Sequence, residues 1–148
     1  MANKSLIGIA GVHHVVSELS RRGLVALPTV KNTAAYDIVV LNELGTKHAN
    51  VQVKTSSNKV TFFPMPHPDK VRAGPRDYYV LVRWCEAESR YQCFLLSGKT
   101  AKASVAENLA YQEKRVKAGV RETLFPCLPI GNRVRAARWA KAWEKWKL

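Results

Sequence analysis

Acidic side chains are scarce in this sequence. Asp and Glu together number 11 against 24 Lys and Arg, which gives a formal net charge of +13. Such an excess of positive charge in a small chain indicates a polyanionic partner, and nucleic acid is a commoner one than a membrane surface. The charge balance therefore predicts binding to nucleic acid and not to a membrane.

Long apolar runs are also lacking. None approaches the roughly 18 residues that a membrane span needs, and the stretch 1–11 does not have the apolar core of a signal peptide. Cysteine occurs three times, without CxxC spacing, at Cys85, Cys93 and Cys127. These features predict a cytoplasmic protein with buried, reduced thiols. The length of 148 residues predicts one domain, 1–148, with a core of its own.

Hydrophobic periodicity predicts a helix over residues 5–22, with Ser5 as its N-cap and Gly23 at its end. Two further helices are expected at 99–118, capped by Ser97 or Thr100, and at about 132–147. Runs rich in Val, Ile and aromatic residues predict strands at 24–27, 36–41, 49–55, 60–63, 78–84 and 91–96. A helix, several strands and two helices in this order predict an α/β or α+β domain with one sheet.

The last predicted helix carries a stripe of tryptophans at helical spacing, Trp139, Trp143 and Trp146. We expect this stripe to dock on the sheet. The rest of the helix surface is strongly basic, which is typical of a solvated face. The same basic face is a candidate contact for phosphates.

The most informative stretch is 36–57, where two predicted strands are joined by a turn at 42–45 that contains Asn and Gly. Asp37 lies among strand residues, and Gln52 and Lys54 are two apart, so that they point to one face of the second strand. Burying a carboxylate, an amide and an amine is costly unless they have a function or a partner. Two structural alternatives stay open: Asp37 caps its strand or pairs with Lys54, and Gln52 with Lys54 forms an ordinary solvent-facing strand edge.

In this context of helix, strand and hairpin, the Asp and the QxK pattern resemble the PD-(D/E)XK nuclease superfamily, which includes archaeal Holliday-junction resolvases and many restriction enzymes. Residues 11–23 match the family's first helix and 25–27 its first strand. Asp37 matches the family Asp, and residues 52–54 stand where (D/E)xK is expected, with Gln in place of the first acid as in small bacterial members. The resemblance covers roughly residues 5–60.

The resemblance implies a restriction-endonuclease-like core over about 5–97, with an N-terminal helix packed on a mixed central sheet, and C-terminal helices over about 99–147. It also implies the metal-dependent hydrolysis of DNA phosphodiester bonds. The implied cofactor is Mg²⁺ or Mn²⁺, both of which prefer oxygen ligands. The implied partner is DNA, and a homodimer is compatible with the resemblance.

The resemblance also assigns roles to residues. Asp37, Gln52 and Lys54 become the catalytic set, in which Lys54 positions water or balances charge in the transition state. The metal ligands become Asp37, the side-chain oxygen of Gln52 and the carbonyl of Val53. The implied contacts to the DNA backbone come from basic and hydroxyl side chains, namely Lys31, Thr55, Ser56, Lys59, Lys70, Arg72, Arg76, Arg133, Arg135 and Arg138.

The sequence departs from the family in its first helix, where resolvase-like members carry a Glu that points at the metal. That position here is Val12. Glu18 lies six residues on, about 240° around the helix, and is expected to face elsewhere. His13 and His14 do not have the phase of the missing Glu. With one firm carboxylate, the alternative function is a catalytically inactive nucleic-acid-binding module or subunit on a nuclease fold.

Overall fold

The computed structural model describes residues 3–30 and 35–148. Its centre is a five-stranded sheet in the order β1-β2-β3-β5-β6, with β3 parallel to β5 and the other neighbours antiparallel. The bounds of these strands are β1 Val25–Pro28, β2 Ile38–Leu41, β3 His48–Ser56, β5 Asp77–Cys85 and β6 Arg90–Ser97.

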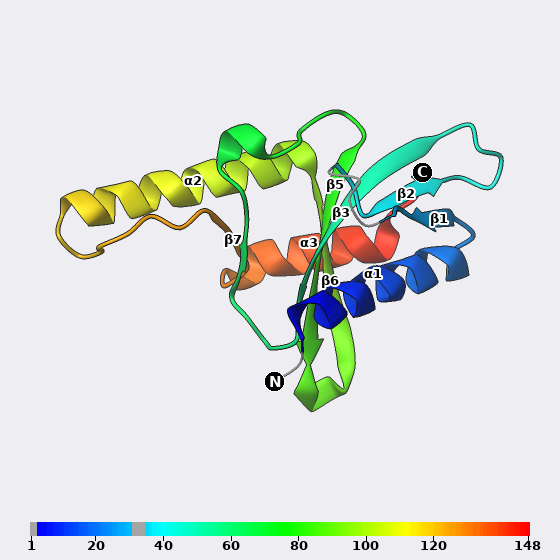
Figure 1. The fold of residues 1–148 in the computed structure, drawn as a ribbon, viewed down its shortest axis with the longest axis horizontal. Coiled ribbons are helices and arrows are strands. Elements are labelled where there is room, and N and C mark those ends of the chain that lie inside the picture. Colours follow the sequence, from blue (N-terminus) through cyan, green and yellow to red (C-terminus); the bar gives the residue numbers. More distant parts are fainter. Residues whose placement is uncertain (1–2, 31–34) are drawn as a thin grey trace.

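Three helices surround the sheet (Figure 1), and they are α1 (Lys4–Arg21), α2 (Gly98–Lys117) and α3 (Arg133–Lys145). A small antiparallel ribbon pairs β4 (Phe62–Pro64) with β7 (Cys127–Pro129) as a second sheet, so the prediction of one sheet was wrong. Single 3₁₀ turns occur at η1 (Pro68–Lys70) and η2 (Glu86–Glu88). The predicted fold class is confirmed, because an N-terminal helix packs on a mixed central sheet and helices follow at the C-terminal end.

Each face of the sheet has its own core. On one face, Val15 and Leu19 of α1 pack with the inward-facing residues of β2, β3 and β5, such as Val51. On the other face, α2 and the β4–β7 ribbon pack on β5 and β6, around residues such as Leu81 and Leu128. Since side chains alternate along a strand, this arrangement decides which residues of β3 face α1 and which face the opposite side.

Helix α3 packs against β6, the last strand of the sheet, and its tryptophans enter both cores. Trp139 belongs to the core on the α2 side, and Trp143 and Trp146 belong to the core on the α1 side. The predicted docking of the tryptophan stripe is therefore confirmed. A helix laid over an edge strand also shields that strand from pairing with other chains.

The helix ends follow local capping chemistry. The Ser5 main-chain N–H donates to Oδ1 of Asn3 at 2.9 Å, so the N-cap of α1 is Asn3, and the prediction of Ser5 was wrong by two residues. Gly23 follows the helix with φ +79°, a conformation that glycine adopts without strain. Ser97 caps α2 as expected, by accepting from the Thr100 N–H at 3.2 Å.

The three cysteines are free and buried, as the sequence predicts. Burial is the main reason why the pKa of Cys93 is raised to about 12. Its thiol therefore stays protonated at neutral pH and is not a nucleophile. Among the residues that the structure describes, no helix combines the length and the apolar character that crossing a membrane requires.

Helix α1 packs closely on β3 at Gly11. A methyl group built at Gly11 would lie 1.8 Å from Oγ1 of Thr55 and 2.8 Å from its Cβ. That Thr55 oxygen is buried and accepts or donates no hydrogen bond within the described residues. The helix can pack this closely on the strand because Gly11 has no side chain.

We expect Gly11→Ala to lower the free energy of unfolding by about 1–3 kcal/mol, the usual cost of overpacking. Gly8→Ala in the same helix is the matched control, because a methyl group there meets no atom within 4 Å. The control should stabilise by up to about 1 kcal/mol through helix propensity. Urea denaturation measures both, and equal effects of the two substitutions would show that the Gly11–Thr55 contact does not limit the approach.

Candidate active site

Asp37 lies directly before β2, at the point where that strand begins beside β3. Its main-chain N–H donates to the Val51 carbonyl at 2.9 Å, and its carbonyl accepts from the Thr29 N–H at 2.9 Å. The carboxylate oxygen Oδ2 accepts from the Val53 N–H at 2.7 Å. The predicted strand therefore begins two residues later than expected, at Ile38. The main-chain N–H of Val53 on β3 therefore has a carboxylate as its acceptor and not the main-chain carbonyl of a neighbouring strand.

This hydrogen bond gives Asp37 the strand-capping role that the sequence left open. It also fixes the carboxylate in one orientation. The second oxygen, Oδ1, accepts no hydrogen bond from any described residue. In an extended strand, the N–H and the carbonyl of one residue point to the same side. The Val53 carbonyl therefore points to the same side as the N–H that Asp37 binds.

A pocket of about 480 Å³ opens beside Asp37, between α1 and the ends of β1 and β2. Val12 lines this pocket together with Asp37 and Val53. The helix position that matches the family Glu in the resemblance thus lines the same pocket as the carboxylate, but it carries an apolar side chain. His13 lines the pocket too, because the pocket extends around the helix towards its N-terminal end. No contact joins His13 to Asp37 within the described residues, and its lack of the Val12 phase stays a prediction.

Glu18 faces elsewhere, as expected. Its carboxylate contacts Arg21 at 2.9 Å and Arg22 at 3.7 Å, and it lines a different hollow. His14 lines that second hollow as well. Burial is the main cause that lowers the pKa of His14, while the nearby Glu18 charge raises it in part. His14 is therefore largely neutral at pH 7.

Gln52 and Lys54 are half-buried on β3 and lie opposite Tyr79 and Leu81 of β5. They occupy the face that is turned away from α1, and neither lines the pocket of Asp37. The pairing of Ile38 with Val51 places Asp37 beside Gln52 when the register is continued by one step. The three residues are thus neighbours in the sheet, while a common contact point for their side chains stays a prediction.

The oxygen donors at this corner fit a hard divalent cation in their chemistry. Asp37 Oδ1 is anionic, and the Val53 carbonyl and the Gln52 amide are neutral donors. Within residues 3–30 and 35–148, no three His, Cys, Asp or Glu side chains gather into a group that could hold a metal. The residues fit a cation in kind but supply little negative charge, which predicts weak affinity.

The hydroxyl and basic residues predicted to contact DNA lie in different places. Lys31 lies outside the described residues. The Thr55 hydroxyl oxygen is buried at Gly11, so this placement does not support a phosphate contact. The Ser56 hydroxyl accepts from the Asn58 N–H at 3.2 Å. Arg72 lies beside the pocket, with its guanidinium 4.7 Å from the ring centre of Tyr36, which lines the pocket.

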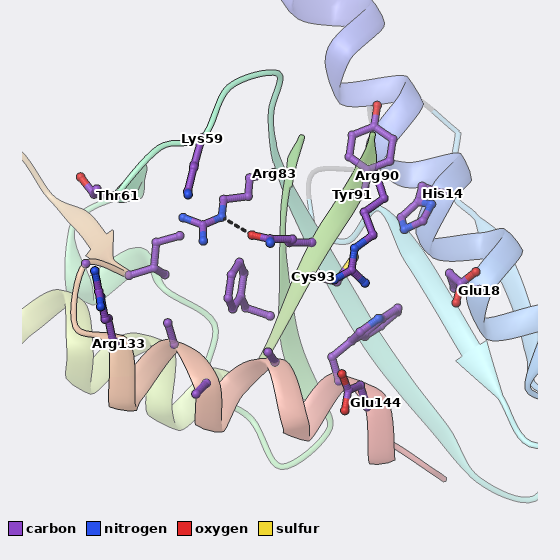
Figure 2. Close-up of a pocket in the computed structure, with 18 of the residues that line it drawn as sticks. His14, Glu18, Lys59, Thr61, Arg83, Arg90, Tyr91, Cys93, Arg133 and Glu144 are labelled. Atoms are coloured by element: carbon purple, nitrogen blue, oxygen red, sulfur yellow. Dashed lines mark hydrogen bonds between the residues drawn. The ribbon is translucent and has the colours of Figure 1, made fainter. Parts of the chain in front are cut away.

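The other predicted DNA contacts are spread over the surface. Lys70 is exposed in η1, and Arg138 is exposed on α3. Arg76 contacts His48 at the opposite end of β3 from Ser56. Arg135 pairs with Glu107 at 3.4 Å. The remaining two, Lys59 and Arg133, line the second hollow, which lies along β6 and α3 and has a volume of about 890 Å³ (Figure 2).

Arg83 projects from β5 into the second hollow and was not among the predicted site residues. A signal was present, because Arg83 continues the alternation of Tyr79 and Leu81 and therefore occupies the face that is otherwise apolar. A charged residue in such a phase is costly without a partner. Tyr36 and Thr29, which line the Asp37 pocket, were missed as well and carry no distinctive pattern.

No family model matches this sequence, and no curated protein matches it. Among solved structures, the chain is similar to that of a bacterial homing endonuclease, I-Ssp6803I, with a TM-score of 0.45 and 16% sequence identity. The similarity covers 66% of this chain and 67% of that one. It describes a partial likeness in the arrangement of the chain and assigns no role to any residue.

Proposed function

We propose that this protein is a metal-dependent endonuclease-like protein that hydrolyses DNA phosphodiester bonds. The observation that carries the proposal is the Asp37 carboxylate, which the Val53 N–H holds in the lining of a pocket beside α1. Gln52 and Lys54 stand next to Val53 on the same strand. The net charge of +13 supports a polyanionic substrate.

In this proposal Asp37 Oδ1, the Val53 carbonyl and the Gln52 amide oxygen hold Mg²⁺ or Mn²⁺. The cation, when bound, supplies Lewis acidity towards the phosphate and lowers the pKa of a bound water. The ammonium group of Lys54 balances the charge that develops on the phosphate oxygens, or orients the attacking water. Because the Val53 N–H fixes the Asp37 carboxylate beforehand, little reorganisation is needed when substrate binds.

The test is nicking of supercoiled plasmid DNA in the presence of Mn²⁺, Mg²⁺ or a chelator. We expect slow cleavage that is faster with Mn²⁺ than with Mg²⁺ and absent with the chelator. Mg²⁺ demands near-ideal geometry and loses its water reluctantly, whereas Mn²⁺ suits carboxylate, carbonyl and water ligands. DNA binding without cleavage under any of these conditions would reject the nuclease.

One observation favours a second candidate, a nucleic-acid-binding module without catalysis. Val12 places an apolar side chain in the pocket of Asp37, at the position that matches the family Glu. Asp37 already has a structural role as the acceptor for Val53. Such a module should bind DNA equally well with and without divalent cations, and its affinity should fall with salt as phosphate contacts are screened.

A further inference from the structure

Arg83 carries a partly buried charge whose described partners are all neutral. Its Nε donates to Oε1 of Gln92 at 2.9 Å, and one terminal nitrogen donates to the Val60 carbonyl at 2.8 Å. The guanidinium lies over the ring of Phe94, 5.2 Å from its centre. These contacts hold the group in one orientation and leave other N–H donors unused.

No carboxylate of the described residues lies within ion-pair distance of Arg83. A partly buried cation without a counter-charge has lost part of its hydration, and a bound anion would compensate for that loss. A rigid guanidinium with free donors matches the geometry of a phosphate group. Arg83 therefore has the free donors and the charge to bind an anion, and no carboxylate of the described residues occupies that position.

Four more cations line the same hollow, and two of them, Arg22 and Arg90, form ion pairs with Glu18 and Glu88. Lys59 and Arg133 are exposed, line the hollow with Arg83 and form no ion pair within the described part of the chain. Figure 2 shows Lys59 and Arg83 close to one another at one end, with Arg133 and Thr61 nearby. The acidic lining residues, Glu18 and Glu144, lie at the other end.

We propose that Arg83, Lys59 and Arg133 form a phosphate-binding site for the backbone of a nucleic-acid strand. This site is separate from the pocket of Asp37. The hollow and the Asp37 pocket share no lining residue, and α1 contributes Val12 to one and His14 to the other. The choice of nucleic acid as the source of the phosphate rests on the proposed function. The phosphate site itself rests on the three cations alone.

The first test compares two double variants of the full-length chain, Lys59→Ala with Arg133→Ala and Lys102→Ala with Lys114→Ala. The control pair is exposed on α2, removes the same charge and lies outside both cavities. Duplex DNA binding is measured by fluorescence anisotropy over a range of salt concentrations with a chelator present. Each lost phosphate contact should flatten the slope of log affinity against log salt by about 0.9, in the first pair only.

The second test follows the Nε–H resonance of Arg83 by NMR while inorganic phosphate is added to the wild type and to the Lys59/Arg133 variant. We expect a saturable shift in the wild type that is much weaker in the variant. If the wild type binds no DNA but shows this shift, the proposed function fails and the phosphate site stands without a nucleic-acid ligand. If phosphate shifts Arg83 but both double variants have equal salt slopes, nucleic acid is not the ligand. The absence of a shift together with equal slopes overturns the site.

Discussion

Replacing Asp37 by Asn is expected to reduce metal-dependent cleavage at least about a hundredfold while the protein stays folded. An amide oxygen can still accept the hydrogen bond from the Val53 N–H, so the capping contact at 2.7 Å is preserved. The negative charge that holds the cation is lost. Removing even a residue that only supports a metal ligand costs about 10–100-fold in affinity or activity, so the loss of a ligand should cost at least the upper value.

Asp37→Ala separates the structural role from the chemical one. It removes the charge and also leaves the Val53 N–H without its acceptor. We expect it to abolish cleavage as Asp37→Asn does, and in addition to lower the free energy of unfolding by about 1–2 kcal/mol. Plasmid nicking and urea denaturation measure the two effects. Wild-type cleavage by the Asn variant would mean that Asp37 only caps the strand.

Restoring the missing acids should have the opposite effect. Val12→Glu together with Gln52→Glu is expected to raise metal affinity and cleavage. We expect about tenfold for each added carboxylate, which corresponds to about 1.4 kcal/mol of binding free energy to the cation. Val12 lines the pocket of Asp37 on the α1 side. Gln52 adjoins Val53 on β3 with its side chain on the opposite face, so the two carboxylates would approach the cation from different sides of the strand. Isothermal titration with Mn²⁺ and plasmid nicking measure the gain.

The matched control for Val12→Glu is Leu6→Glu, also combined with Gln52→Glu. Leu6 is an exposed residue of α1 that does not line the pocket, so this control adds the same charge to the same helix. It should gain less than the Val12 variant. If the Val12 variant folds, binds DNA and still neither holds Mn²⁺ nor cuts, the missing acids are not the explanation. The binding module is then the better account of the protein.

The longer elements of the fold could be predicted to within one or two residues. Periodicity over many positions placed α1, α2, β5 and β6 close to their observed bounds. The β7 strand was missed because it spans three residues and owes its existence to pairing with β4, far away in the sequence. The cap at Asn3 was missed because Asn3 and Ser5 are both residue types that favour the N-cap position.

The site could be predicted in part, for a related reason. Asp37 is the aspartate that the strand pattern singles out, and the structure places it beside Val53. Its hydrogen bond was not predictable, because it depends on where β2 begins relative to β3. The burial of the Thr55 hydroxyl depends on how closely α1 packs at Gly11. Distances between elements that are far apart in the sequence cannot be predicted from the local sequence pattern.

The most direct measurement of the central claim is Mn²⁺ titration followed by paramagnetic broadening of the main-chain amide resonances, with a DNA duplex bound. A cation held by Asp37 should broaden the Val53 and Gln52 amides first, together with those of α1 near Val12. In Asp37→Asn this selective broadening should disappear while DNA binding persists. Broadening that is the same in both proteins, or that begins elsewhere in the chain, would contradict a metal site at Asp37.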